Sequence, residues 1–341
     1  MKLFELDNIK CLQSDEVNYR FDRKTGMMMT WGKTISEDPN YSPYGPFILD
    51  IEVTTKCKGP GGYLCPFCYK SNTTNGKNMS FDTFKKVLDK MPNVLTQIAF
   101  GADAQATSNP YLFDMMRYSR HKGVIPNITV ADIDDDTALT LSKLCGAVAV
   151  SRYDNKNICY DSVKRLTDRG MEQINIHQMI CQETLDQTYE TLDDIKNDSR
   201  LSKLNAIVFL SLKKKGRGVG YTPLTQEQFK RLVDRAFELK ISFGFDSCGA
   251  NKFLQSVKER SNYKQLEQMA EPCESSCFSF YIDVDGKGYP CSFTEGCHGW
   301  DEGIDIVGCD DFVADVWNNE RIKKFRERII KCGRSCFLYN V

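Results

Sequence analysis

The stretch "FILDIEVTTKCKGPGGYLCPFCYK", residues 47–70, joins a short apolar run to three cysteines, Cys57, Cys65 and Cys68. The run has the aromatic and β-branched residues that favour a strand. Six more such runs follow: "LTQIAF", "IPNITVA", "AVAVSRY", "QINIHQMI", "NAIVFLSL" and "ISFGFD". Helical stretches separate them. Strands that alternate with helices of ten or more residues are typical of a parallel sheet built from βαβ units.

The helical stretches agree with this pattern, because Ser80 is a good N-cap residue and Gly123 and Gly170 stand where helix C-caps are expected. An eight-stranded barrel needs more chain than this region offers, so we predict an α/β fold with an open, partial (βα)6 barrel. The expected helices lie near residues 80–91, 110–122, 136–145, 158–169, 186–197 and 225–239.

Three domains are expected from the composition along the chain. Residues 1–46 should form an N-terminal cap with a hairpin around Lys24-Thr25-Gly26. The barrel should occupy residues 47–264. Residues 265–341 should form a small cysteine-rich α+β module, with the hairpin "FSFYIDVDGKGYPC" and a last helix near 313–330.

The overall composition is that of a globular enzyme, with 41% hydrophobic and 27% charged residues and a net charge of -1. No apolar run reaches membrane-spanning length and no secretory signal is readable, so we expect a soluble cytoplasmic protein without a membrane partner. The near-neutral charge argues against a protein that coats nucleic acid.

Fifteen cysteines are many for a cytosolic chain, and in a reducing compartment they point to metal or catalysis. Cys57, Cys65 and Cys68 follow the first strand, at the sheet edge where ligand sites collect. Zinc usually takes four closed ligands, whereas these are three with no histidine nearby. A 4Fe-4S cluster takes one ligand per iron, so three thiolates would leave one iron open.

This loop, with Phe67 before its last cysteine, resembles that of the radical S-adenosylmethionine (radical SAM) enzymes, which usually carry C-x3-C-x2-C. The C-x2-C half matches, but the first gap holds seven residues; we expect the Gly-rich insert "KGPGGYL" to bulge without displacing Cys57. The resemblance implies that a 4Fe-4S cluster binds S-adenosylmethionine and cleaves it reductively. The resulting 5'-deoxyadenosyl radical would abstract a substrate hydrogen atom.

The same resemblance extends to the ends of later strands. "FGADAQAT" stands where the family has a Gly-Gly-Glu-like turn, and Ser151 where it has a polar cofactor contact. The alternatives are an ordinary strand-end serine and, for His177, a satisfied core histidine. The cofactor-binding residues implied are Phe67, Gly101, Ala102, Asp103, Asn127, Ser151, Arg152, His177 and Gln178.

The C-terminal cysteines resemble the auxiliary-cluster extension called SPASM, or its shorter twitch form. Gly286 and Cys291 supply the G-x4-C element of its hairpin. The full seven-cysteine pattern is absent, so the resemblance implies one auxiliary 4Fe-4S cluster; the alternative is a zinc ribbon. Cys297 and Cys309 are left over, and each is either a further ligand or an ordinary thiol. The implied ligands are drawn from Cys273, Cys277, Cys291, Cys332 and Cys336.

Two further features suggest substrate chemistry. Cys248, after the last strand, is a candidate hydrogen-atom donor and Asp246 a candidate base; the alternatives are a buried cysteine and a turn-capping aspartate. The run "LKKKGRG", residues 212–218, is either a solvated loop or an anchor for an anionic substrate.

Together these features predict a radical SAM enzyme that modifies a peptide or protein by crosslinking, epimerisation or oxidation. One alternative is radical chemistry on a small molecule, sugar or nucleotide. Another is a non-enzymatic zinc or iron-sulfur protein. The enzyme would need an electron donor such as flavodoxin or ferredoxin.

Overall fold

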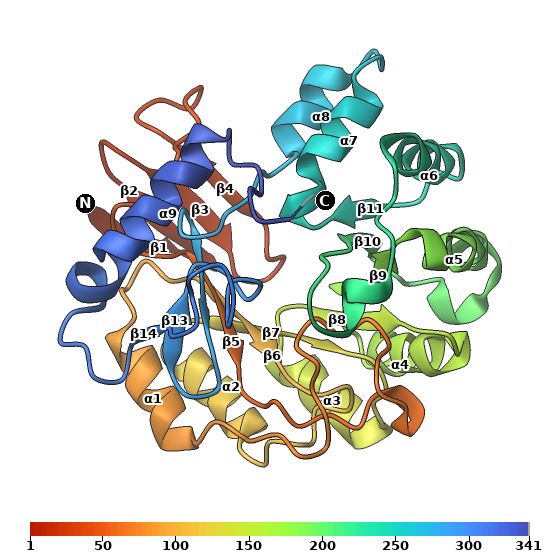
Figure 1. Ribbon diagram of the computed structural model, residues 1–341, viewed down its shortest axis with the longest axis horizontal. Helices are drawn as coiled ribbons and strands as arrows, with labels where there is room; N and C mark the ends of the chain where they lie inside the picture. Colours follow the sequence, from red (N-terminus) through yellow and green to blue (C-terminus); the bar gives the residue numbers. More distant parts are fainter. Residues whose placement is uncertain (340–341) are drawn as a thin grey trace.

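The computed structural model describes residues 1–339, and its centre is a ten-stranded sheet in the order β11-β10-β9-β8-β7-β6-β5-β12-β13-β14 (Figure 1). From β5 to β11 every neighbouring pair is parallel and the strand order follows the chain. The predicted α/β fold is therefore confirmed. These strands are β5 (Ile48–Glu52), β6 (Gln97–Gly101), β7 (Ile125–Val130), β8 (Val148–Arg152), β9 (Ile174–Ile180), β10 (Ala206–Ser211) and β11 (Phe243–Phe245).

Six helices connect these strands and form a ring outside the sheet (Figure 1). Each lies within two residues of its expected position. The Ser80 hydroxyl accepts a hydrogen bond from Thr83 N (3.0 Å), as an N-cap should. Gly123 and Gly170 adopt positive φ after the second and fourth helices. The helices are α1 (Phe81–Lys90), α2 (Leu112–His121), α3 (Asp135–Leu144), α4 (Lys156–Asp168), α5 (Leu185–Asn197) and α6 (Gln226–Glu238).

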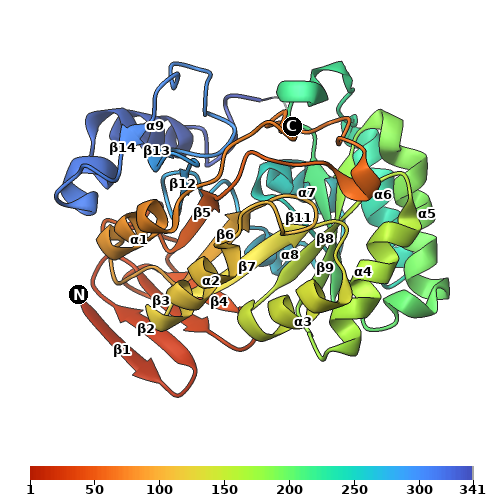
Figure 2. The same cartoon turned by 90° about the horizontal axis from the view of Figure 1, so that it is seen from below.

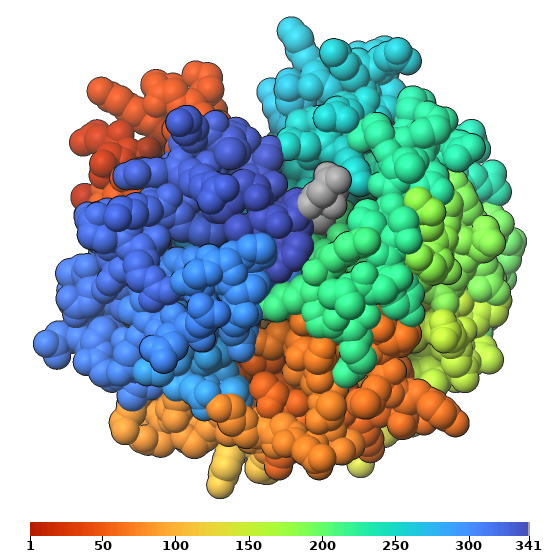
Figure 3. Space-filling model, in the orientation of Figure 1, coloured from red at the N-terminus to blue at the C-terminus, as the bar shows by residue number. Residues whose placement is uncertain are grey.

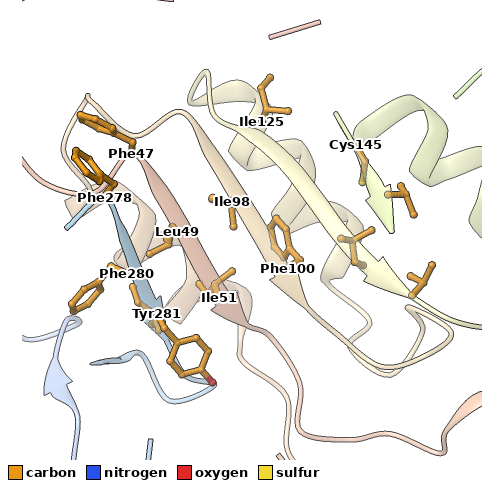
Figure 4. Packing of buried hydrophobic residues seen from close by; sticks show 14 of the residues in the cluster. Phe47, Leu49, Ile51, Ile98, Phe100, Ile125, Cys145, Phe278, Phe280 and Tyr281 are labelled. Atoms are coloured by element: carbon orange, nitrogen blue, oxygen red, sulfur yellow. The ribbon is translucent and has the colours of Figure 1, made fainter. Parts of the chain in front are cut away.

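The hydrophobic core lies between the helices and the sheet face that they cover. Ile98 and Phe100 alternate along β6 and are both buried, and Phe100 packs on Phe84 of α1 with ring centroids 5.6 Å apart. Figure 4 shows Leu49 and Ile51 of β5 in the same layer. Each such buried side chain stabilises the fold by about 1.5–3 kcal/mol.

The N-terminal cap is an antiparallel sheet of four strands in sequence order. The expected hairpin at Lys24-Thr25-Gly26 joins its last two strands, and two further hairpins precede it. Tyr19 attaches this sheet to the barrel, since its hydroxyl donates to Val94 O (3.0 Å) and its ring packs edge-on to Phe47. The strands are β1 (Lys2–Leu6), β2 (Ile9–Gln13), β3 (Asn18–Asp22) and β4 (Met28–Trp31).

The C-terminal hairpin extends the barrel sheet. Its first strand, β12 (Ser279–Ile282), pairs in parallel with β5, and β13 (Lys287–Tyr289) and β14 (Ile304–Asp305) follow. Its turn contains Gly286 at φ +78°. The cysteine-rich segment is thereby fixed beside the first barrel strand.

The last predicted helix is two elements, a π-helical turn η6 (Phe312–Trp317) and α9 (Glu320–Lys331). The break occurs because the Asn319 side chain accepts from Arg321 N (3.0 Å) and starts a new helix. Two short helices after β11, α7 (Ala250–Val257) and α8 (Tyr263–Met269), were not predicted. Within residues 1–339, no helix has both the length and the apolar character needed to cross a membrane.

Candidate functional site

The candidate site begins with the face of the sheet that the helices leave uncovered. Along β9 and β10, residues alternate between buried and half-buried, and β6 alternates likewise. The buried set packs under the helices, so the half-buried set forms the inner face. This inner face is polar at Asp50, Gln97, Asn127, Thr129, Ser151, Asn175 and His177.

Two of the expected cofactor residues lie on the opposite, helix-covered side. Arg152 pairs with Glu190 of α5 (3.1 Å), and Gln178 hydrogen bonds to Gln187 of the same helix (3.1 Å). Each is one residue beyond an inner-face position, and neighbouring strand residues point to opposite faces. This placement argues against the predicted cofactor contacts of Arg152 and Gln178.

Ser151, His177 and Asn127 do lie on the inner face. The pKa of His177 is lowered to about 4 by burial, so its imidazole is neutral at pH 7. Its Nδ1 lies 3.5 Å from Thr129 Oγ1. Asn127 already donates to Gln97 Oε1 (2.8 Å) and accepts from Ala147 N (2.8 Å), which leaves Ser151 and His177 with more capacity for a ligand.

The turn after β6 is used partly by the fold itself. Asp103 is buried and its Oδ1 accepts from Thr107 N (3.1 Å) and Ser108 N (2.9 Å). Its Oδ2 is buried and accepts no hydrogen bond from any of residues 1–339. The Gly101 carbonyl accepts from Val53 N (2.9 Å). Asp103 and Gly101 thus form hydrogen bonds within the fold, while Ala102 between them is half-buried.

The cysteine loop, residues 57–68, crosses above the carboxyl ends of the strands, where Figure 2 shows it in orange. Arg217 holds it, because its guanidinium donates to Cys65 O (2.7 Å) and Asn72 O (3.1 Å) and its backbone N donates to Cys68 O (3.0 Å). Gly216, at φ +56°, permits this approach: a Cβ there would lie 2.6 Å from Cys68 O.

Two aromatic rings pack against Phe67, the residue before the last cysteine of the loop. Phe67 stacks on Tyr153, with centroids 5.6 Å apart and ring planes 13° apart. Tyr221 meets the edge of Phe67 at 5.7 Å. Tyr153 follows β8 closely, so Phe67 anchors the loop over the end of that strand. Through Tyr153, Phe67 is therefore held near the end of β8, the strand that carries the inner-face residue Ser151.

The three loop thiols suit an iron-sulfur cluster by donor type, since all are half-buried and no histidine competes. Burial raises the pKa of Cys65 to about 11, a cost that metal binding would have to offset. Among residues 1–339, no three His, Cys, Asp or Glu side chains converge closely enough to hold one metal ion. The binding of a cluster by Cys57, Cys65 and Cys68 remains a prediction.

The seven-residue insert is folded onto neighbouring strand ends. Gln105, after β6, donates to Gly59 O (2.9 Å), and Asp132, after β7, accepts from Gly61 N (3.0 Å). Gly59 has φ +75°, and a Cβ there would lie 1.8 Å from Tyr63 O. Tyr63 itself is 82% exposed. The insert thus lies over this edge of the sheet instead of projecting freely.

A buried charged cluster links the cysteine loop to the C-terminal hairpin. Lys70 pairs with Glu52 (3.1 Å) and with Glu295, and donates to Tyr281 Oη (2.8 Å). Nearby on the inner face, burial raises the pKa of Asp50 to about 6, and no hydrogen bond or ion pair within residues 1–339 involves its carboxylate. Asp50 and Glu52 were not predicted as site residues, although two carboxylates at alternate positions of an apolar strand are a signal in the sequence.

The basic run after β10 is largely consumed by internal contacts. The buried Lys213 pairs with Asp246, and Lys215 donates to three backbone carbonyls, including Glu295 O (2.6 Å). Only Lys214 of the three lysines is exposed. Figure 3 shows this green segment packed between the orange cysteine loop and the blue C-terminal segment. The run therefore connects the segments around the mouth of the barrel. Asp246, the candidate base, forms an ion pair with Lys213.

The C-terminal cysteines separate into two groups. Cys273, Cys291 and Cys336 line one cavity, and Cys248 joins them there. Cys277 and Cys332 are not among the residues that line it. Cys332 is exposed in the turn after α9. The structure thus brings together three of the five expected auxiliary ligands and adds Cys248, which was expected to be a hydrogen-atom donor.

Comparisons with known proteins add little to this geometry. No family model matches the chain, and no curated protein matches it. Among solved structures, BtrN in complex with AdoMet and 2-DOIA shares 13% identity over 83% of this chain and 86% of that chain, with a TM-score of 0.46. An HpcH/HpaI aldolase from Desulfitobacterium hafniense DCB-2 shares 9% sequence identity over 87% of this chain and 96% of its own chain, with a TM-score of 0.36. With sequence identities and TM-scores this low, the two similarities give no evidence about ligands or activity.

Proposed function

We propose that this chain is a radical SAM enzyme. The observation that supports the proposal is a loop of three thiols without histidine, placed above the carboxyl ends of a parallel sheet with an open, polar inner face. In such a site a 4Fe-4S cluster would supply the electron for reductive cleavage of S-adenosylmethionine, and the radical so formed would remove a hydrogen atom from the substrate. The electron donor would be a flavodoxin or a ferredoxin.

The chain's own residues would bind and orient the reactants. Cys57, Cys65 and Cys68 would hold the cluster, and Arg217 fixes their loop through its backbone carbonyls. Ser151 and the neutral His177 would offer hydrogen bonds to a ligand on the inner face. The insert and the C-terminal segment cover part of the mouth, which would limit the access of water to the radical.

For the substrate we propose a peptide or protein first, and a small molecule, sugar or nucleotide second. The basic run supports this order, because Lys213, Lys215 and Arg217 are bonded internally and do not form an anchor for phosphate. Within residues 1–339 no group hydrogen bonds to the Asp50 carboxyl on the inner face, so a hydroxyl or amine donor on the substrate would suit it.

The test is anaerobic reconstitution with iron and sulfide, followed by incubation with dithionite and S-adenosylmethionine. We expect about eight irons per chain and formation of 5'-deoxyadenosine. A Cys57→Ala, Cys65→Ala, Cys68→Ala variant should lose this product, whereas Cys332→Ala should keep it. A triple variant that still forms 5'-deoxyadenosine would contradict the proposal. One zinc and no iron in the purified protein would favour the non-enzymatic alternative.

A further inference from the structure

Four thiols from four distant segments line one cavity between the barrel and the C-terminal segment. They belong to Cys248, Cys273, Cys291 and Cys336. The cavity encloses about 320 Å³ of space, its open mouth included. The cavity that Ser211, Leu212 and Lys252 help to line has no cysteine among its lining residues.

The fold determines which cysteines meet here. Cys248 lies in the short η5 helix (Ser247–Gly249) directly after β11, and Cys291 lies after β13. Cys273 and Cys336 are joined through Arg334, because Cys273 N donates to Arg334 O (2.9 Å) and the Arg334 guanidinium donates back to Cys273 O (3.1 Å). Three of the four thiols thus come from the C-terminal segment and one from the barrel.

The remaining C-terminal cysteines have other surroundings. The backbone carbonyl of Cys277 accepts from Ser42 N (2.9 Å), toward the N-terminal cap. Cys297 donates to Phe293 O (3.0 Å). Cys309 donates to Ile306 O (3.2 Å). Cys332 is exposed.

The placement of the four thiols around one cavity suits a cluster better than a single ion. Zinc bound by four thiolates at about 2.3 Å would bring the sulfurs to about 3.8 Å from each other. No three potential ligands in residues 1–339 converge in that way. A 4Fe-4S cluster instead takes one thiolate at each iron, with its own sulfides between them. Phe325, Ile329 and Leu338 line the same cavity and would shield such a cluster.

We infer that Cys248, Cys273, Cys291 and Cys336 ligate the auxiliary 4Fe-4S cluster, with the barrel supplying the fourth ligand. This inference deepens the proposed function and rests on it for the auxiliary role. Four thiolates leave no iron open, so this cluster cannot bind substrate directly and is left with electron transfer or structural linkage. Cys248, as a thiolate ligand, has no S–H bond to give to a substrate radical.

The test uses the full chain carrying Cys57→Ala, Cys65→Ala and Cys68→Ala, so that only the auxiliary site can hold iron. After anaerobic reconstitution we expect about four irons per chain and a 4Fe-4S absorption and electron paramagnetic resonance spectrum. Adding Cys248→Ala should lower the iron content and change the spectrum. The matched controls Cys332→Ala and Cys277→Ala should leave both unchanged.

Several results would overturn the assignment. They are full iron content with an unchanged spectrum after Cys248→Ala, loss of iron after Cys332→Ala, or one bound zinc in place of iron. If Cys248→Ala does not fold, Cys248→Ser keeps the side-chain volume and must show the altered spectrum. Since no readout is turnover, failure to cleave S-adenosylmethionine would refute the proposed function and leave this assignment standing.

Discussion

The buried charged cluster around Lys70 provides the sharpest test of the contact between the cysteine loop and the C-terminal hairpin. Lys70 lies between Glu52 and Glu295, and its ammonium also donates to Tyr281 Oη. The side chains of Lys70 and Glu52 are only 11% and 5% exposed. Lys70→Met keeps the length of the side chain and removes its charge, which leaves two neighbouring carboxylates without their cation.

The expected cost follows from burial. Removing one partner of a buried ion pair costs about 3–5 kcal/mol, and since Glu295 is 24% exposed, we expect about 3 kcal/mol, at the lower end. Lys77 is a matched control, because it also joins the loop region to the hairpin, through Asp285. Both of those side chains are more than half exposed, so Lys77→Met should cost at most about 0.5 kcal/mol.

The cost of Lys70→Met should also depend on pH. Burial raises the pKa of Glu52, and Lys70 opposes that rise. Without Lys70 the folded-state pKa moves further above the unfolded value, so ionised Glu52 destabilises the variant as pH rises and the penalty fades as pH falls. Urea titrations at pH 5 and pH 8 measure this. Equal costs for the two lysine variants, or no pH dependence, would refute the reasoning.

Two other substitutions test the inner face and the support of the loop. Burial raises the pKa of Asp50 to about 6, so its ionisation opposes folding as pH rises. The free energy of unfolding of Asp50→Asn should therefore increase by about 1 kcal/mol relative to wild type between pH 5 and pH 8. A difference between the two proteins that stays constant with pH in urea titrations would contradict this. Arg217→Met should speed iron loss to a chelator from the reconstituted protein, because it removes two hydrogen bonds to backbone carbonyls of the loop region. Lys214→Met, at an exposed lysine, is the control. Equal rates of iron loss from the two variants would show that Arg217 does not hold the loop.

The order and type of the barrel elements could be predicted from local sequence patterns. Hydrophobic periodicity and capping are local properties, so the position of Ser80 was enough to place the start of α1. The hairpin at Gly26 was predictable for the same reason, since its positive φ is a property of the turn. The crowding of three cysteines after the first strand was also plain from the sequence.

Which of these residues can act together depends on how the distant segments pack. Ser151 and Arg152 are neighbours in the chain, yet only Ser151 reaches the inner face, because the helices cover the other side. Cys248 and Cys336 share a cavity only because the C-terminal hairpin pairs with β5 and turns the chain back across the barrel. Such contacts between distant segments depend on how whole elements pack, which local sequence patterns do not specify.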